Sequence, residues 1–485
     1  MDSIKWDKEV DALVVGSGAG GMSAALTASV EGLDVLLVEK TGHIGGSTAI
    51  SGGALWIPLN AQTDAAGHPD SFDKVWTYLQ ETVGAAASDD MKRAYLQAGP
   101  RMMDDLVERG FLQVAARTAS PDYYPDRPGA ALGGRSLDPV EFDGRKLGRH
   151  FKTLRDPLKE FTVLGGMMVN ITDVRHLLRA TRAFTSWRHA MKLVLRYYTD
   201  RLRGYHRGTR LLLGNALAAQ LFHALLSRNI PYWLDTPALG LVRGDDGAVL
   251  GVTVMRQGRQ MSIRARRGVV LATGGFPWDS ARRQQAYPHP TGDWSMSPRD
   301  NTGDGIRMAE GAGAALGQGH CSPAFWAPVS ILEQPGRAPL HYPHLVWDRA
   351  KPGLIAVNGA GRRFVNESTS YHAFVEAMYR SHADTPTVPA YLLCDQRFID
   401  TWGLGLALPG GRPRQHLIDA GYLLQAPTLQ ALAQKLGVPA DALAATVQRY
   451  NQHAAEGHDP DFGKGGTAYN LSLIHISEPT RQAEI

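Results

Sequence analysis

Residues 11–39 read DALVVGSGAGGMSAALTASVEGLDVLLVE, and this stretch decides the fold. It contains two short apolar runs, Ala12–Val15 and Val35–Val38, which have the length and β-branched content of buried parallel strands. A glycine-rich turn and a helix-like stretch lie between them, which is the order of a strand–helix–strand unit. The segment therefore predicts an α/β fold of the doubly wound, Rossmann-like type.

The glycine-rich turn has the spacing that binds the phosphates of a dinucleotide. Gly16 permits the tight turn, Gly18 lets the backbone approach a pyrophosphate, and Gly21 lets the helix pack closely on the strand. The phosphates then lie at a helix N-terminus, where free N–H groups favour negative charge. Glu39 ends the second run, where its carboxylate can accept hydrogen bonds from ribose hydroxyls, and this argues against NADP. We therefore expect a bound adenine dinucleotide.

Two further glycine-rich segments suit contact with a flat ligand. Residues 41–53 read TGHIGGSTAISGG, where paired glycines with hydroxyls between them fit a backbone that lies against a ligand, although a flexible loop has the same composition. Residues 268–271 form a third buried strand, which ends in Ala272-Thr273-Gly274-Gly275. Hairpin turns are expected before it, at Asp246-Gly247 and Gln257-Gly258.

Two tyrosine-bearing segments are candidates for chemistry, because the sequence has no Walker, HExxH or GxSxG motif. The first is PDYYP at 121–125, followed by GGRS at 133–136, and the second is RFVNESTSY at 363–371. By composition alone, such tyrosines are more often half-buried packing residues than catalysts.

Taken together, the glycine-rich segments resemble a known superfamily. VEK at 38–40, GGST at 45–48, SGG at 51–53 and ATGG at 272–275 are similar to the flavin-contacting segments of the FAD-dependent fumarate reductases and 3-ketosteroid dehydrogenases. The resemblance implies a non-covalent FAD, because Gly46 stands where covalently flavinylated relatives carry a histidine. The residues that it implies for FAD binding are Gly16, Gly18, Ala19, Gly21, Glu39, Lys40, Gly45, Gly46, Ser47, Thr48, Ser51, Gly52, Gly53, Thr273, Gly274, Gly275 and Asp304.

Within this superfamily, DYYP…GGRS and RFVNESxxY resemble the 3-ketosteroid Δ1-dehydrogenases. By this resemblance, Tyr371 removes the proton next to the 3-keto group, a hydride passes to FAD, and Tyr123 supports Tyr371 by a hydrogen bond. Fumarate reductases are similar here but place an arginine four residues after the glutamate, where this chain has Tyr371 after Glu367. An arginine suits a dicarboxylate, whereas a tyrosine suits a neutral, apolar ketone.

Other functions stay open from the sequence. One is a related FAD-dependent dehydrogenase or ene-reductase of another apolar ketone or enoate, or a flavoprotein similar to fumarate reductase. Another is an inactive dinucleotide-binding chain, because the family's ketone-polarising tyrosine and glycine N–H are expected beyond Asn470. The electron acceptor is unknown, and a quinone is plausible.

Composition agrees with a large enzyme that acts on a small molecule. The chain has 485 residues, 44% hydrophobic and 20% charged, which is enough for at least two domains. Its formal charge of +4 is small for this length, so no nucleic-acid partner is expected. No metal site is expected either, and the cysteines Cys321 and Cys394 form no disulfide framework or metal motif. We expect a cytoplasmic location, with membrane association as an alternative.

A basic segment from Val174 to Arg210 is the regional exception. Apolar residues within it fall on one face of an expected helix, which predicts either a helix that lies on an anionic membrane surface or a helix packed on the protein with a solvated basic face. We favour the packed helix because that arrangement is common. The apolar residues are Phe184, Trp187, Met191, Val194, Leu195, Tyr198 and Leu202.

The order of the motifs predicts the domain organisation. We expect an FAD-binding domain over 1–290 with a basic helical insertion at about 150–210, and an inserted α+β catalytic domain over 291–460. Residues 461–470 are expected to begin the return to the FAD domain, with a surface loop at 461–466. Residues 471–485, LSLIHISEPTRQAEI, match a translated sequencing adapter over Leu471–Arg481, so we expect a non-native tail without defined core contacts.

Overall fold

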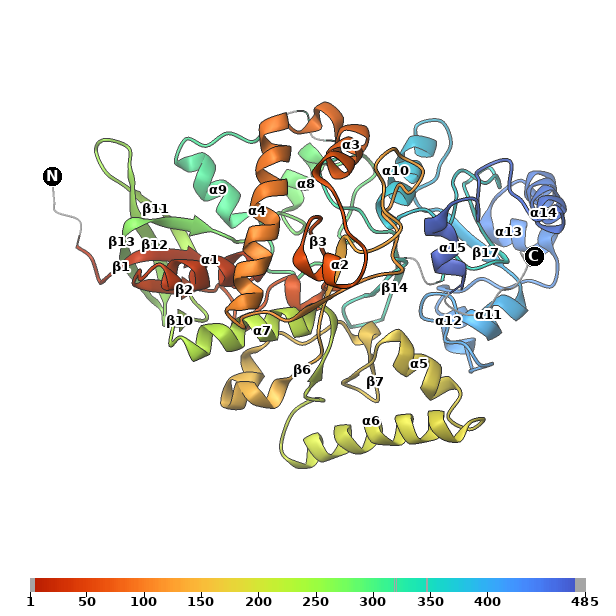
Figure 1. Cartoon of the computed structure of the whole chain (residues 1–485). Coiled ribbons are helices and arrows are strands. Elements are labelled where there is room, and N and C mark those ends of the chain that lie inside the picture. Colours follow the sequence, from red (N-terminus) through yellow and green to blue (C-terminus); the bar gives the residue numbers. More distant parts are fainter. Residues whose placement is uncertain (1–4, 318, 320, 346–347, 476–485) are drawn as a thin grey trace.

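The computed structural model describes residues 5–317, 319, 321–345 and 348–475, and it is built around a six-stranded sheet of order β10-β2-β1-β13-β12-β11 (Figure 1). Strands β10, β2, β1 and β13 are parallel neighbours, whereas β11, β12 and β13 form an antiparallel meander. This arrangement confirms the α/β fold class. The strands are β1 (Lys8–Val15), β2 (Val35–Val38), β10 (Tyr232–Trp233), β11 (Ala238–Arg243), β12 (Val249–Arg256) and β13 (Arg259–Leu271).

Strand β13 is longer than the predicted run at 268–271. Its first half pairs with β12, and its residues from Ile263 to Leu271 pair with β1, with a register shift between Val10 and Ala12 of β1. The two hairpin turns lie where predicted. Gln257 and Gly258 both have positive φ angles, as a tight primed turn requires. At the other turn only Gly247 has a positive φ angle, and its N–H donates to the carbonyl oxygen of Gly244 over 2.9 Å.

Apolar side chains cover both faces of β1 and β2, which is why these strands read as continuous apolar runs. On one face, Val14 and Leu37 pack with Met22 of α1 (Ala19–Val30) and Phe222 of α7 (Leu213–Ser227). On the other face, Leu13, Val15, Leu36 and Val38 pack with Val252 and Ile263 of the meander. The sheet therefore has a core on each side.

Two peripheral layers complete the N-terminal half. The first carries a small sheet of β3 (Leu55–Trp56), β5 (Ser136–Pro139) and β4 (Val114–Ala116) with α2 (Ala61–Ala65), α3 (Phe72–Thr82) and α4 (Asp89–Glu108). The second carries β6 (Phe142–Asp143) paired with β9 (Arg210–Leu211), β7 (Thr162–Val163) paired with β8 (Met167–Met168), and helices α5 (Ile171–Leu178) and α6 (Phe184–Leu202). Short 3₁₀ helices lie at Thr48–Ile50, Gly84–Ala86, Gly144–Thr153 and Lys159–Phe161.

The orientation of α6 differs from the packed helix that we favoured. Its buried residues include Ala190, Leu193 and Tyr197, whereas Trp187 and Leu202 on the predicted inward face are exposed. The periodicity identified an apolar face, but only its edge contributes to packing, where Val194 lies against a small cluster of Met167, Leu193 and Tyr197. The helix is therefore rotated relative to the prediction.

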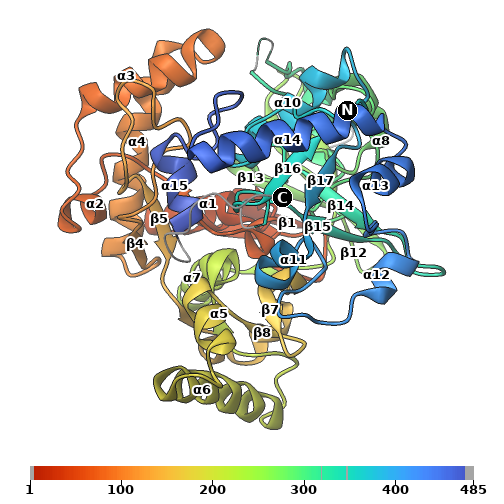
Figure 2. The ribbon, with the colours of Figure 1, turned by 90° about the vertical axis from the view of Figure 1, so that its right-hand side faces the viewer.

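The C-terminal half is a mixed region of short sheets and helices (Figure 2). Its sheets are β14 (Val329–Leu332) with β15 (Leu340–Pro343), and β16 (Leu354–Val357) with β17 (Tyr391–Cys394). Its helices are α8 (Ser280–Ala286), α9 (Asp304–Gly311), α10 (Tyr371–His382), α11 (Gln396–Trp402), α12 (Gln415–Asp419), α13 (Leu429–Leu436), α14 (Ala440–Glu456) and α15 (Ala468–His475). Within the described part of the chain, none of the helices is long and apolar enough to cross a membrane.

The segment after α14 agrees with the predicted surface loop at 461–466 except at one residue. The segment has no helix or strand, and Asp461, Gly463 and Gly466 are exposed. Lys464, by contrast, is buried and its ammonium donates to the carbonyl oxygen of Leu354. Of the predicted tail at 471–485, residues 471–475 continue α15 and Leu471 is partly exposed. Residues 476–485 and the side chains of 472–475 lie outside the described residues, so the tail stays a prediction.

Candidate active site

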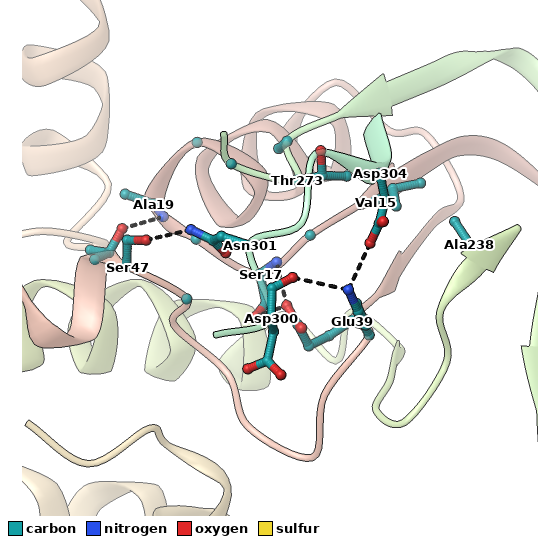
Figure 3. A pocket seen from close by; sticks show the side chains of 18 of the residues that line it. Val15, Ser17, Ala19, Glu39, Ser47, Ala238, Thr273, Asp300, Asn301 and Asp304 are labelled. Atoms are coloured by element: carbon teal, nitrogen blue, oxygen red, sulfur yellow. Dashed lines mark hydrogen bonds and ion pairs between the residues drawn. The ribbon is translucent and has the colours of Figure 1, made fainter. Parts of the chain in front are cut away.

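The two predicted dinucleotide turns meet at the carboxyl end of the central strands (Figure 3). The backbone N–H of Ala272 donates to the carbonyl oxygen of Val15 over 2.8 Å. Gly16 has a φ of +104°, and a Cβ atom there would lie 2.3 Å from the oxygen of Ala272. The close approach of the two turns therefore requires glycine at this position.

A pocket opens between these turns, and most of the predicted cofactor residues line it. Its lining includes Gly16, Gly18, Ala19, Glu39, Lys40, Gly46, Ser47, Thr48, Thr273, Gly274 and Asp304. The helix α1 begins at its edge, where the N–H of Ala19 donates to Thr48 Oγ1 over 3.0 Å. A Cβ atom on Gly18 would have only Thr48 Oγ1 near it, at 3.7 Å, so the backbone here is open to a ligand.

Glu39 is tied to the protein through both carboxylate oxygens. Its Oε2 accepts from the N–H and the hydroxyl of Ser17, at 3.0 and 2.6 Å, and its Oε1 accepts from the N–H of Thr41 at 3.0 Å. The single hydroxyl proton of Thr41 lies within reach of both Glu39 Oε1 and the carbonyl oxygen of His43. Because that proton serves only one of them, Oε1 retains capacity to accept from a ribose hydroxyl.

Lys40 joins the nucleotide half of the chain to the turn at residues 300–304. Its ammonium donates to Asp304 Oδ2 and Thr302 Oγ1, each at 2.8 Å, and to the carbonyl oxygen of Asp300 at 3.0 Å. Burial alone would raise the pKa of Asp304, but the hydrogen bonds from Lys40 and Thr302 outweigh it and the net pKa is lowered. Asp304 is therefore ionised, and Asn301 beside it donates to Ser47 over 2.9 Å (Figure 3).

Six predicted cofactor residues lie outside the lining of this pocket. Gly21 packs beneath it, since a Cβ there would lie 1.9 Å from the carbonyl oxygen of Gly16. Gly45 donates its N–H to the carbonyl oxygen of Ser17, and Gly53 packs on the backbone of Gly214. The remaining three are Ser51, Gly52 and Gly275.

The pocket also contains residues that sequence reasoning missed. Arg155, Asp300 and Asn301 line it, and Arg155 Nη2 donates to Asp300 Oδ2 over 3.1 Å. The Nε of Arg155 is buried without a hydrogen-bond partner among the described residues. Arg155 belongs to no recognisable motif, so only the fold could place it here.

The residues present fit a dinucleotide such as FAD. The turns lack side chains where phosphates would approach, a helix N-terminus faces the pocket, and Arg155 offers an unused donor for an anion.

The structure brings the two predicted tyrosines together. The hydroxyl of Tyr123 donates to that of Tyr371 over 3.2 Å, and the rings meet edge to face with centroids 5.8 Å apart. Although 45% of Tyr123 is exposed, desolvation of its hydroxyl, followed by the nearby Tyr371, raises its pKa well above the usual range. Tyr123 therefore stays protonated and able to donate.

A third tyrosine, which sequence reasoning missed, closes this cluster. Tyr469 of α15 meets Tyr123 edge to face with centroids 5.3 Å apart. Tyr469 is buried, and desolvation raises its pKa to about 12.

A buried ion network holds the loop that carries Tyr123. The Arg135 guanidinium bonds to Asp122 and Asp70, each at 2.7 Å, and all three side chains are almost completely buried. Asp122 also accepts from the indole N–H of Trp56 over 2.8 Å. The Asp of DYYP and the Arg of GGRS therefore act as a structural clamp on either side of Tyr123.

A second buried network holds Tyr371 at the first residue of α10. Arg363 bonds to Glu367 at 2.9 Å and to Asp459 at 2.8 Å, and Lys464 lies 3.5 Å from Glu367. Burial alone would raise the pKa of Glu367, but Lys464 and Arg363 outweigh it and the net pKa is lowered. The RFVNES sequence therefore anchors the start of α10 to the segment that follows α14.

The comparisons with known proteins agree with this architecture. The family model described as "FAD binding domain" matches residues 11–482. The 3-oxosteroid 1-dehydrogenase of Mycobacterium tuberculosis (strain H37Rv) is 37% identical over 96% of this chain and 82% of its own. The 4-oxocyclohex-2-ene-1-carboxylate 5-dehydrogenase of Sinomonas cyclohexanicum is 35% identical over 96% of this chain and 79% of its own.

A solved structure is also similar over almost the whole length. The 3-ketosteroid Δ1-dehydrogenase of Sterolibacterium denitrificans, in complex with 1,4-androstadiene-3,17-dione, has a TM-score of 0.86 and 36% identity. The similarity covers 98% of this chain and 85% of that one.

Proposed function

Since the chain belongs to the family of FAD-binding dehydrogenases that includes the 3-oxosteroid 1-dehydrogenases, we propose that it introduces a C1–C2 double bond into 3-ketosteroids. The observation that carries this proposal is the hydrogen bond between Tyr123 and Tyr371, two residues 248 positions apart that come from separate motifs.

In the proposed reaction, Tyr371 accepts the proton from the carbon next to the 3-keto group. A tyrosine at its ordinary pKa is a poor base at neutral pH, so a neighbouring group must stabilise its deprotonated oxygen. Tyr123 donates a hydrogen bond to the Tyr371 oxygen and so stabilises the tyrosinate form, which is the form that accepts the proton. Bound FAD supplies the acceptor for the hydride that leaves the neighbouring carbon.

The cofactor in this proposal is a non-covalent FAD. We expect its pyrophosphate over residues 16–21 with Arg155 as an added donor, and a ribose on Glu39 Oε1. Gly46, which lines the pocket, has no side chain to form a covalent bond with the flavin.

A smaller ring ketone is a second candidate substrate. The Sinomonas relative, whose name gives a 4-oxocyclohexene carboxylate as its substrate, matches this chain about as well as the steroid enzymes do. Fold and cofactor do not decide between the two substrates.

The test is steady-state turnover of the FAD-loaded protein with an artificial electron acceptor. We expect turnover of 4-androstene-3,17-dione and much slower turnover of 4-oxocyclohex-2-ene-1-carboxylate. Fumarate is reduced rather than oxidised, so it is tested separately with a reduced viologen as electron donor, and we expect its reduction to be slow. Preference for the cyclohexene substrate would favour the second candidate, and preference for fumarate would contradict both.

The variant Tyr371→Phe tests the assigned base. Loss of the proton acceptor should lower kcat by about 10²–10⁴-fold while FAD and steroid binding persist. The matched control is Tyr124→Phe, because Tyr124 follows Tyr123 in the same DYYP segment. Its hydroxyl makes no hydrogen bond among the described residues. Near-normal turnover by Tyr371→Phe would overturn the mechanism.

A further inference from the structure

Helix α6 presents an apolar stripe to the solvent. It is the outermost element on its side of the molecule in both views (Figures 1 and 2). The exposed apolar residues are spaced by three, eight, three and four positions, and this helical spacing places them on one face of α6. They are Phe184, Trp187, Leu195, Tyr198 and Leu202, and Leu202 is 89% exposed.

The opposite face of α6 already holds the helix on the protein. Leu193 and Tyr197 pack against Met167, and the Tyr197 hydroxyl donates to the carbonyl oxygen of Leu164 over 2.8 Å. Asp200 accepts from the N–H and the hydroxyl of Thr209 at 2.9 and 2.8 Å. These contacts attach α6 to the protein without the residues of the stripe. The packing of this chain therefore gives no reason for large apolar side chains at the exposed positions.

Cations lie beside the stripe without acidic partners. Arg182, Arg188, Lys192 and Arg203 are exposed, and no carboxylate pairs with any of them in the part of the chain that the structure describes. By contrast, Arg196, nearer the packed face, bonds to Glu141 over 3.1 Å. The solvent-facing side of α6 therefore combines an apolar stripe with an uncompensated positive rim.

We propose that α6 docks on the surface of an anionic phospholipid bilayer. The stripe then enters the boundary between headgroups and acyl chains, with Trp187 and Tyr198 at the depth that aromatic side chains prefer, while the cations meet lipid phosphates. A second copy of the chain fits this face poorly, because docking stripe on stripe would bring two positive rims together. The inference stands independently of the proposed reaction.

Vesicle co-sedimentation of the full-length, FAD-loaded chain tests the proposal. We expect binding to phosphatidylcholine vesicles that contain phosphatidylglycerol, much weaker binding to pure phosphatidylcholine, and loss of binding at high salt. The triple variant Trp187→Ser, Leu195→Ser and Leu202→Ser should bind at least about tenfold more weakly, because the apolar area is lost. The double variant Arg188→Glu with Lys192→Glu should lower the affinity for anionic vesicles by at least about fivefold for each reversed charge.

The matched control is Met91→Ser with Leu408→Ser, which removes exposed apolar side chains from elsewhere on the surface, 68% and 54% exposed. This control should bind vesicles as the wild type does, and turnover in the absence of lipid should be unchanged in every variant. Absence of binding to anionic vesicles, or equal binding by wild type and the triple variant, would overturn the proposal. So would a lipid-free dimer, seen by light scattering, that the triple variant abolishes, because a second copy would then be the occupant.

Discussion

The Tyr123 hydroxyl stays protonated because desolvation raises its pKa, and it donates a hydrogen bond to the oxygen of Tyr371. We predict that Tyr123→Phe slows turnover by about tenfold, since one hydrogen bond contributes about 1–1.5 kcal/mol. The same loss should raise, by about one unit, the apparent pKa of the basic group in the pH profile of kcat. An unchanged profile in Tyr123→Phe would show that the contact has no role in proton transfer.

Glu39 has two roles at the residue scale, because it holds Ser17 and Thr41 and also lines the pocket. We predict that Glu39→Lys weakens FAD binding by roughly 1–3 kcal/mol, the cost of leaving buried polar groups unpaired. Fluorescence titration of the apoprotein with FAD measures this. Ser17→Ala, which removes the hydroxyl that donates to Glu39 and accepts from Gly45 but removes no ribose acceptor, is the control and should change the FAD affinity less. Equal affinities of wild type and Glu39→Lys would contradict the assignment.

At the scale of elements, short-range sequence patterns predicted the structures that depend on neighbouring residues alone. The strand–turn–helix unit of β1, α1 and β2 and the hairpins at Gly247 and Gly258 depend on short-range rules of periodicity and backbone conformation. The outward face of α6 could not be predicted, because periodicity identifies an apolar face without saying what covers it. Burial of Lys464 was equally hidden, because its partner Glu367 lies 97 residues away.

The network around Glu367 ties β16, the loop before α10 and the segment after α14 together. We predict that Glu367→Gln lowers the free energy of unfolding by about 3–5 kcal/mol at neutral pH, because Arg363 and Lys464 lose a buried anionic partner. Urea unfolding measures this. Glu108→Gln, at an exposed position, should change it little.

The pH dependence of this effect has a definite sign. The folded-state pKa of Glu367 is lowered, so its stabilisation is complete above its ordinary pKa of about 4.3 and is lost as the pH falls through the folded value. The difference between wild type and Glu367→Gln should therefore be largest near neutral pH and shrink in acid. A difference that grew on acidification would contradict the ionised state of Glu367.

For the whole molecule, the nucleotide pocket is also where the two halves of the chain meet. The turn at residues 300–304 contacts Lys40, Ser47 and Arg155, all of which lie in the N-terminal half. The domain boundary near residue 290 stays a prediction, but these bonds cross it. Binding of FAD between the turns is thus expected to stabilise the association of both halves.

A double-mutant cycle on Lys40 and Asp304 tests this coupling. The two side chains are partly exposed, so the ion pair between them should contribute only about 0.2–1 kcal/mol. The bonds of Lys40 to Thr302 and Asp300 add to it, so Lys40→Met should weaken FAD binding more than Asp304→Asn does. The double variant should weaken FAD binding by less than the sum of the single effects, because the contact is lost only once. Additive effects on FAD affinity, measured by titration of the apoproteins, would show that Lys40 and Asp304 act on the cofactor separately rather than through the joint between the two halves.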